Sequence, residues 1–347
     1  MNTAPFIHKN KGIGRPQILL IGNGLERKQD PNGKGQPEWS EFLDKLRAPG
    51  RAAITEEEKK KVPFPLLYQL LSTPNPAPPV LSAEDIRQEE KRLADGLGVL
   101  SHESNALLDR LPTLGADHIL TTNYPYSLEA AFCPKLDFTK PRIRSAARFS
   151  LAPPDKNKKI HRERCYRLHT GYEVRNSDGS RVGLWHIHGE TSVPTGIVVG
   201  HDRYGRLLSR MEKLCAKELS HSKEETAREY RSWPELFLFG DVYVLGFEFA
   251  LCEYDLWWLL RRKQRERYAD GHVYYFTNHD ITESSVLFRL LASHGVLLNP
   301  FGVQKQVDYP AFYSMAMDTI AEQIRINKGS IVQHNRKAAN KAQGGLV

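Results

Sequence analysis

The sequence has few cysteines and none of the long apolar runs that mark membrane proteins. Its four cysteines form no CxxC pair, which argues against both a structural zinc site and a disulfide framework. No stretch reaches the roughly eighteen consecutive apolar residues of a membrane-spanning helix. Residues 1–14 lack the apolar core of a signal peptide. We therefore expect a cytoplasmic protein with reduced thiols, no bound metal and no membrane contact.

The composition is that of an ordinary globular chain with an excess of positive charge. Hydrophobic residues make up 40% and charged residues 26% of the 347 positions, as in most soluble proteins. A net charge of +8 can attract nucleic acid or other polyanions. No recognised nucleic-acid-binding module accompanies this charge, so a solvated basic surface is the favoured interpretation. Any contact with nucleic acid is expected to be non-specific.

Short apolar runs recur along the chain, and most are followed by a polar or glycine-containing turn and then by a helical pattern. This repeated order predicts an α/β fold with a doubly wound, parallel (Rossmann-like) sheet. Helices are predicted to include 37–46, 207–231 and 253–265. The predicted strands lie within 17–21, 118–124, 184–190, 196–200, 242–245, 273–276 and 295–298.

The interruptions of this pattern suggest how the chain is divided. We expect one domain over 17–327, preceded by an arm at 1–16 and followed by a polar, disordered tail at 328–347. The turn residues at 176–179 predict a hairpin over 166–182. Helical or irregular insertions into the domain are expected at about 47–100, 133–183 and 205–235.

Polar or glycine residues stand at the carboxyl ends of most of the predicted strands. In an open parallel sheet these ends meet in one crevice, where such folds bind nucleotides. Glycines after the first strand let backbone amides approach a phosphate, although the third glycine of the GxGxxG pattern is replaced by Arg27. The candidate binding residues are Gly22, Asn23, Gly24, Thr122, Asp202, Gly246 and Asn278.

Two further strand-end residues are candidates for catalysis. His188 follows an alternating strand pattern and precedes Gly189, which permits a sharp turn. Imidazole exchanges a proton near neutral pH, but a histidine between apolar residues is also commonly a structural core residue. His186 faces the opposite side of the strand and is the weaker candidate for a base. Asn123 stands at a strand-to-helix junction, where it can meet a ligand or cap the helix.

In their order along residues 17–300, these segments resemble the sirtuin-like family in its divergent bacterial branch. The strand ends around Asn123 and His188 are similar to the segments that carry the family's active-site asparagine and histidine. Phe276-Thr277-Asn278 is similar to the strand end whose asparagine contacts the adenosine ribose. The other similar segments are Gly22-Asn23-Gly24, Gly35 to Trp39 with Phe42-Leu43, Ile197 to Val199, Asp202 to Tyr204, Val244 to Phe247 and Asp255 to Leu260.

The resemblance implies that NAD is the substrate and that the reaction is hydrolysis to ADP-ribose and nicotinamide. Nicotinamide is cationic in NAD and leaves without a general acid, so the enzyme must stabilise an oxocarbenium-like state and handle one proton. By this resemblance His188 is the expected base, and Asn123 positions the water or the ribose. The branch further implies a bacterial antiphage effector, a homo-oligomer, and a separate partner protein that triggers or restrains the activity.

Alternative functions remain at this stage. An NAD-dependent protein deacylase or ADP-ribosyltransferase is one, but the zinc-binding cysteine pairs of deacylating sirtuins are missing. A sensor that binds NAD or ADP-ribose without turnover is another. The presence of both Asn123 and His188 argues against a sensor, because a sensor does not require the base. The sensor and the hydrolase differ in whether nicotinamide is released from NAD.

Overall fold

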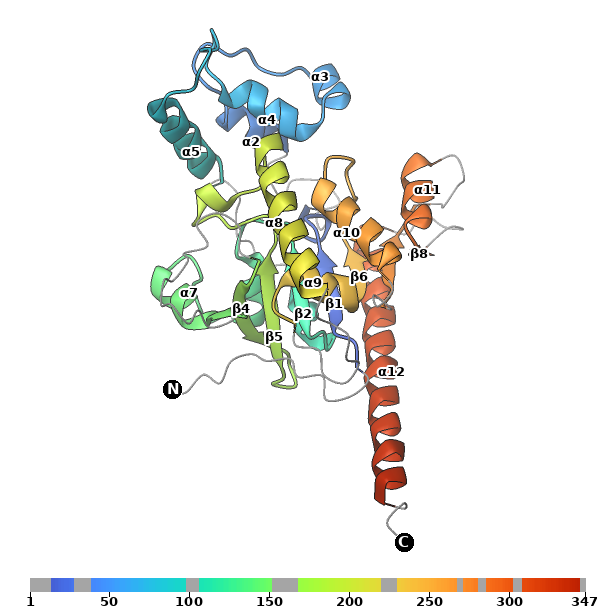
Figure 1. The fold of residues 1–347 in the computed structure, drawn as a ribbon. Helices are drawn as coiled ribbons and strands as arrows, with labels where there is room; N and C mark the ends of the chain where they lie inside the picture. Colours follow the sequence, from blue (N-terminus) through green and yellow to red (C-terminus); the bar gives the residue numbers. More distant parts are fainter. Residues whose placement is uncertain are drawn as a thin grey trace.

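The computed structural model is an α/β protein built on one eight-stranded mixed sheet that is mostly parallel (Figure 1). It describes residues 14–27, 39–97, 106–151, 168–219, 230–266, 271–279, 285–301 and 308–343. The strands lie in the order β3-β4-β5-β2-β1-β6-β7-β8. Their bounds are Gln17–Ile21 (β1), His118–Thr121 (β2), Arg148–Ser150 (β3), Thr170–Arg175 (β4), Arg181–His186 (β5), Asp241–Leu245 (β6), Val273–Thr277 (β7) and Val296–Pro300 (β8).

The centre of the sheet is a group of parallel strands that are buried on both faces. All five residues of β1 are buried, and this strand pairs in parallel with β2 on one side and β6 on the other. A strand covered on both faces reads as a continuous apolar run instead of an alternating one. This is why the sequence pattern located β1, β2, β6 and β7.

Helices cover both faces of the sheet, and alternate residues of the strands point to two separate cores. Ile18 and Leu20 of β1 face a core that contains side chains of α8–α11, whereas Leu19 and Ile21 face a core that contains side chains of η1, α6 and α12.

The remaining helices are α1, α2–α5, α7 and η2. Helix bounds are Gly24–Arg27 (α1), Trp39–Lys45 (α2), Glu56–Lys61 (α3), Phe64–Ser72 (α4), Ala83–Leu97 (α5), Leu108–Thr113 (η1), Ser127–Phe132 (α6), Pro141–Ala147 (α7), Pro194–Gly196 (η2), His201–Leu219 (α8), Trp233–Phe239 (α9), Tyr254–Arg265 (α10), Val286–Ser293 (α11) and Tyr309–Gln343 (α12).

One edge of the sheet is antiparallel, which corrects the expectation of a wholly parallel sheet. The predicted hairpin is present, with β4 pairing antiparallel to β5 from Tyr172–Leu184 to Arg175–Arg181, and β3 adds a further antiparallel strand. The two strands of a hairpin are antiparallel. Because β5 also pairs in parallel with β2, it joins the antiparallel edge to the parallel part of the sheet. Within the predicted insertion at 133–183, β3, β4 and the first residues of β5 therefore belong to the sheet.

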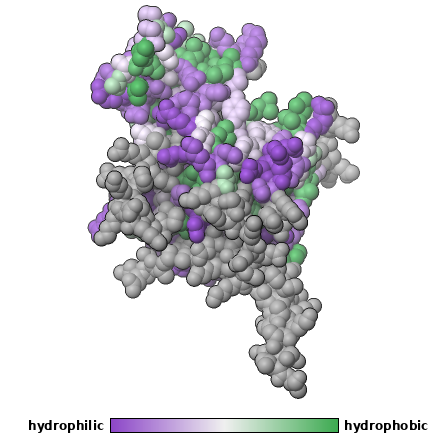
Figure 2. Space-filling view, viewed as in Figure 1, coloured by the Kyte–Doolittle hydropathy of each residue, from purple (hydrophilic) through white to green (hydrophobic). Residues whose placement is uncertain are grey.

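The helices α2–α5 form a separate helical module beyond one end of the sheet (Figure 1). Their small core includes Phe42, Leu67 and Leu93 and is completed by Tyr124, Ile197 and Val199 from the segments that follow β2 and η2. Apolar side chains also face outward, since Leu66 and Leu70 of α4 are 44% and 46% exposed, and Figure 2 shows hydrophobic patches among hydrophilic ones on this module. This module contains most of the predicted insertion at 47–100.

Two sequence predictions between β5 and β6 were wrong. Residues 196–200 do not form a strand: η2 ends at Gly196, Ile197 is extended, and none of the buried residues 197–200 belongs to a strand. Helix α8 begins at His201 instead of Leu207, and its described part runs to Leu219, so the predicted continuation toward 231 falls largely on residues that the structure does not describe. Residues 220–229 lie outside the described part of the chain.

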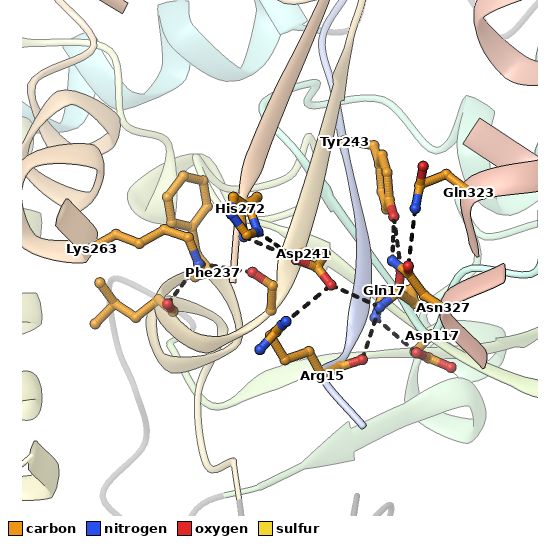
Figure 3. Close-up of polar contacts among 12 residues, drawn as sticks. Arg15, Gln17, Asp117, Phe237, Asp241, Tyr243, Lys263, His272, Gln323 and Asn327 are labelled. Atoms are coloured by element: carbon orange, nitrogen blue, oxygen red, sulfur yellow. Dashed lines mark hydrogen bonds and ion pairs between the residues drawn. The ribbon is translucent and has the colours of Figure 1, made fainter. Parts of the chain in front are cut away.

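The sequence predicted a polar, disordered tail at 328–347, and the structure describes a helix over most of this range. Helix α12 continues through Gln343 and extends past the sheet in Figure 1. Figure 3 shows how its middle is anchored: Asn327 Nδ2 donates to Gln17 Oε1 and to the Tyr243 hydroxyl, both at 3.1 Å. Lys328 Nζ donates to Asp117 Oδ1 at 2.8 Å. These long-range contacts hold the helix to the amino ends of β1 and β2.

Candidate functional site

A cavity of about 440 Å³ lies where the carboxyl ends of the parallel strands face the helical module. Its volume is within the range of small-molecule binding sites. Residues that follow β1, β2, β6 and β7 line it, and Phe42, Leu43, Phe64 and Leu67 of the module close it from the other side. Of the residues predicted from the sequence, the cavity brings together Asn23, Gly24, Thr122, Asn123, His188, Gly246 and Asn278.

His188 reaches the cavity because the chain turns sharply after β5. Gly189 has a φ of +94°, and a Cβ there would lie 2.5 Å from the carbonyl oxygen of Gly196. Only glycine fits this combination of backbone angle and close approach. The turn is held by the amide of Val198, which donates to the carbonyl oxygen of His188 at 2.8 Å. The imidazole of His188 is therefore presented by a rigid, buried segment.

Two carboxylates from the start of α10 flank the His188 ring. Its Nε2 atom lies 2.9 Å from Asp255 Oδ2, and its Nδ1 atom lies 3.6 Å from Glu253 Oε2. Burial lowers the pKa of His188, but the negative charges of Asp255 and Glu253 outweigh burial and raise this pKa from 6.5 to about 9. His188 is therefore an imidazolium at neutral pH in this arrangement, stabilised by its two neighbours.

Glu253 is linked in turn to α8. The hydroxyl of Tyr204 donates to Glu253 Oε2 at 2.8 Å, and the Tyr204 ring packs edge-on against the His188 ring. Burial raises the pKa of the Glu253 carboxyl, although His188 acts in the opposite direction. No sequence pattern predicted a catalytic role for Glu253, Asp255 or Tyr204. The Glu-x-Asp spacing at the start of a predicted helix was the available signal.

Asn123 is held by an acidic residue of the first turn. Its Nδ2 atom donates to Glu26 Oε1 at 2.8 Å, and the Ser127 hydroxyl donates to the same oxygen at 2.6 Å. The helix-cap alternative for Asn123 is wrong, because α6 begins after Tyr126, which occupies its N-cap position without a side-chain bond. The amide of Asn123 is thus fixed at the cavity wall by tertiary contacts.

His186 does not line the cavity. Its Nε2 atom lies 2.7 Å from Glu129 Oε1, and its Nδ1 atom lies 2.7 Å from the backbone oxygen of Asn123. Side chains two residues apart in a continuous strand share a face, so strand alternation does not explain why His186 and His188 meet different surroundings. They differ because β5 ends at His186 and the chain turns before Gly189. His186 is part of a buried polar contact between β5 and α6.

The glycines of the first turn serve the packing of two strand ends. The amides of Gly22 and Gly24 donate to the carbonyl oxygens of Leu245 and Gly246 at 3.2 and 2.8 Å. A Cβ on Gly22 would lie 2.4 Å from the Gly246 oxygen. Gly22 does not line the cavity, so the structure does not place it with the other predicted binding residues. These two amides already have carbonyl partners.

Asp202 also lies outside the cavity lining. It stands in the first turn of α8, its side chain is 51% exposed, and it lies 3.5 Å from Arg206 of the same helix. The expected strand at 196–200 would have ended next to it. Since that strand is absent, Asp202 is not one of the strand-end residues that meet at the cavity.

His188, Glu253 and Asp255 are also arranged so that they can hold a metal ion. One ligand atom from each lies within 4.8 Å of the others, and Asp255 Oδ1 is buried without a hydrogen-bond partner among the described residues. Imidazole and carboxylate donors suit a divalent transition metal. Cys133, Cys215 and Cys252 are free thiols, whereas Cys165 lies outside the described residues. The expectation of a metal-free protein therefore remains a prediction.

Because comparison with known proteins gave no match, the site is interpreted from its own geometry. No protein-family model matches the chain, and no curated protein matches it either. Among the described residues, no helix is both long enough and apolar enough to cross a membrane.

Proposed function

We propose that the protein is an NAD hydrolase that cleaves NAD to ADP-ribose and nicotinamide. The observation that supports this most is that Asn123 and His188, which follow different strands of the sheet, line one cavity together with Asn278. In a doubly wound, Rossmann-like sheet the carboxyl ends of the strands form the nucleotide site. A polar amide and an ionisable cluster at one such site are suited to glycosidic bond cleavage.

The proposed reaction breaks the bond between the nicotinamide nitrogen and C1′ of the ribose. The bonding electrons leave with nicotinamide, water bonds to C1′, and one proton of the water must be removed. We assign the reacting end of NAD to Asn123 and His188. We assign the adenosine end to Asn278, with Asn23, Thr122, Gly24 and Gly246 along the intervening part.

The charge of the cavity favours a cationic reacting group. Glu26 and Glu253 line it, and Asp255 lies directly behind His188. The two carboxyl groups of Glu253 and Asp255 thus stand beside the single imidazole of His188. In a water-poor cavity, such fixed negative charge stabilises positive charge that develops on the ribose.

Release of nicotinamide from NAD by the purified chain tests the proposal. The reaction should be run with the chain alone and with proteins encoded beside it, because the activity is expected to depend on a partner. Equimolar nicotinamide and ADP-ribose would support hydrolysis. Binding of NAD without nicotinamide release under any of these conditions would make the protein a sensor. Transfer of an acyl or ADP-ribosyl group to a protein would likewise contradict hydrolysis.

The wider biological role is part of the same proposal. We propose an antiphage effector of the bacterial cytoplasm that lowers cellular NAD when a separate partner protein releases its activity. Homo-oligomerisation is proposed as well, and light scattering of the purified chain tests it. Contact of the basic surface with nucleic acid is proposed to be non-specific, so its strength should fall steeply with salt.

A further inference from the structure

The two ring nitrogens of His188 both face carboxylate oxygens, at 2.9 Å for Asp255 and 3.6 Å for Glu253. A neutral imidazole carries one lone pair, which would then point at a negatively charged oxygen. A doubly protonated ring instead directs an N–H group toward each carboxylate. The geometry therefore favours the imidazolium form and leaves His188 without a lone pair that can accept a proton.

Glu253 is the more accessible member of this group. Its side chain is 16% exposed, compared with 3% for His188 and none for Asp255, and it lines the cavity. The contacts from Tyr204 and His188 both go to Oε2. Within the described residues, no hydrogen bond or ion pair is recorded for Oε1, so this oxygen is available to a water molecule.

We propose that Glu253 is a further catalytic residue, which accepts a proton from the attacking water while His188 acts as its charged partner. This rests on the proposed NAD hydrolysis. Water bonds to C1′ through its oxygen, the C1′–N bond breaks toward nicotinamide, and the proton moves to Glu253 Oε1. The resulting carboxylic acid then returns the proton to solvent, so the cycle balances. Asp255 and Tyr204 are positioning residues that fix the imidazolium and the carboxylate.

The surroundings of Glu253 suit this role. Its Oε2 atom accepts from the Tyr204 hydroxyl at 2.8 Å and lies 3.6 Å from His188 Nδ1, so the carboxylate is held in place at the cavity wall. Because the base stays negative until it takes the proton, it also stabilises the cationic ribose up to that point.

The principal competing explanation is a divalent metal ion held by the same three side chains. A metal would occupy the carboxylate oxygens and supply the charge itself. Activity measurements with and without a chelator separate the two. Turnover that persists in EDTA supports the proton-acceptor role of Glu253, whereas turnover that is lost in EDTA and restored by Mn²⁺ overturns it.

Glu253→Gln tests the proposal with little change in shape. The amide oxygen still accepts from Tyr204, but the side chain no longer takes a proton. We expect kcat to fall on the order of 10²-fold or more, while the Kd for ADP-ribose, measured by calorimetry, stays within a few-fold. Glu89→Gln is the matched control, since Glu89 also accepts a tyrosine hydroxyl, from Tyr68 at 2.6 Å, and lies outside the cavity lining.

Chemical rescue gives a second readout that a structural role does not produce. Glu253→Ala in the presence of formate should recover part of its turnover, because the small carboxylate replaces the missing base. Tyr204→Phe should lower kcat by a smaller factor than Glu253→Gln. Tyr254→Phe is the control for it, because the Tyr254 ring packs against Tyr204 but does not line the cavity.

The results separate this inference from the proposed function. Wild-type cleavage together with normal cleavage by Glu253→Gln overturns the role of Glu253 alone. A wild-type chain that neither binds ADP-ribose nor releases nicotinamide under any condition overturns the NAD hydrolase itself. A Glu253→Gln chain that loses ADP-ribose affinity in parallel with kcat, without formate rescue of Glu253→Ala, assigns Glu253 to binding and also overturns the inference.

Discussion

The Nδ1 atom of His186 lies 2.7 Å from the backbone oxygen of Asn123. This contact ties the end of β5 to the loop after β2. On the other side of the ring, His186 meets the fully buried Glu129 at 2.7 Å. The position of the Asn123 amide in the cavity thus depends partly on a histidine that does not itself line the cavity.

His186→Ala is expected to cost mainly stability. The change removes two buried polar contacts and leaves the Glu129 carboxylate without this partner, a loss of about 2–4 kcal/mol in the free energy of unfolding. Urea unfolding measures it, and cleavage per folded molecule should fall far less than in His188→Ala. A His186→Ala chain that folds normally but is inactive, beside an active His188→Ala chain, would show that the wrong histidine had been placed in the reaction.

Stability should fall as the pH rises from about 6.5 through about 9. The pKa of His188 is raised to about 9 in the folded chain by Asp255 and Glu253, against the effect of burial. Its stabilisation is complete below its unfolded pKa near 6.5 and is lost as the pH passes the folded value, since the folded state then gives up the proton. The total is on the order of a few kcal/mol. Urea unfolding at pH 6.5 and 9.5 should show a shallower change for His188→Gln, and equal changes for both chains would contradict the assignment.

Substitutions of Asn123 and Asn278 should affect different quantities, turnover for Asn123 and NAD affinity for Asn278. Asn123→Ala is expected to lower turnover strongly and to leave NAD affinity within a few-fold, because Asn123 is assigned to the reacting end. Asn278→Ala should weaken NAD binding by roughly 1–2 kcal/mol, the value of one lost hydrogen bond, so that saturating NAD restores much of the rate. Calorimetry and single-turnover nicotinamide release measure both effects. Normal turnover by a folded Asn123→Ala chain would remove Asn123 from the mechanism.

The anchoring of α12 is tested by Asn327→Ala. This change removes the bonds to Gln17 Oε1 and to the Tyr243 hydroxyl, so the free energy of unfolding should fall by about 1–3 kcal/mol. Arg325→Ala is the control, because its exposed ion pair with Glu322 within one turn of the helix contributes little. Thermal unfolding compares the two. Equal melting temperatures would mean that the helix contributes nothing through this contact.

Local sequence patterns located those strands and helices whose buried faces require apolar residues at regular intervals. The apolar runs of β1, β6 and β7 and the apolar face of α10 were located correctly, since strands and helices with buried faces must repeat hydrophobic residues at fixed intervals. The run at 196–200 was misassigned because an extended buried segment has the same composition as a strand. Helix α12 was not predicted over any of its length, although Phe312, Met317 and Ile320 repeat at helical spacing in its first half.

The sequence by itself determined the α/β order of elements, the sharp turn at Gly189 and the placement of Asn123 and His188 at strand ends. Only the tertiary structure decided that Glu253 and Asp255 flank His188, because α10 lies about 65 residues further along the chain and its approach depends on how the helices pack. The same holds for Glu26 beside Asn123 and for the antiparallel edge of the sheet. Local residue patterns fix local structure, whereas the charge around a catalytic group depends on segments that only folding brings together.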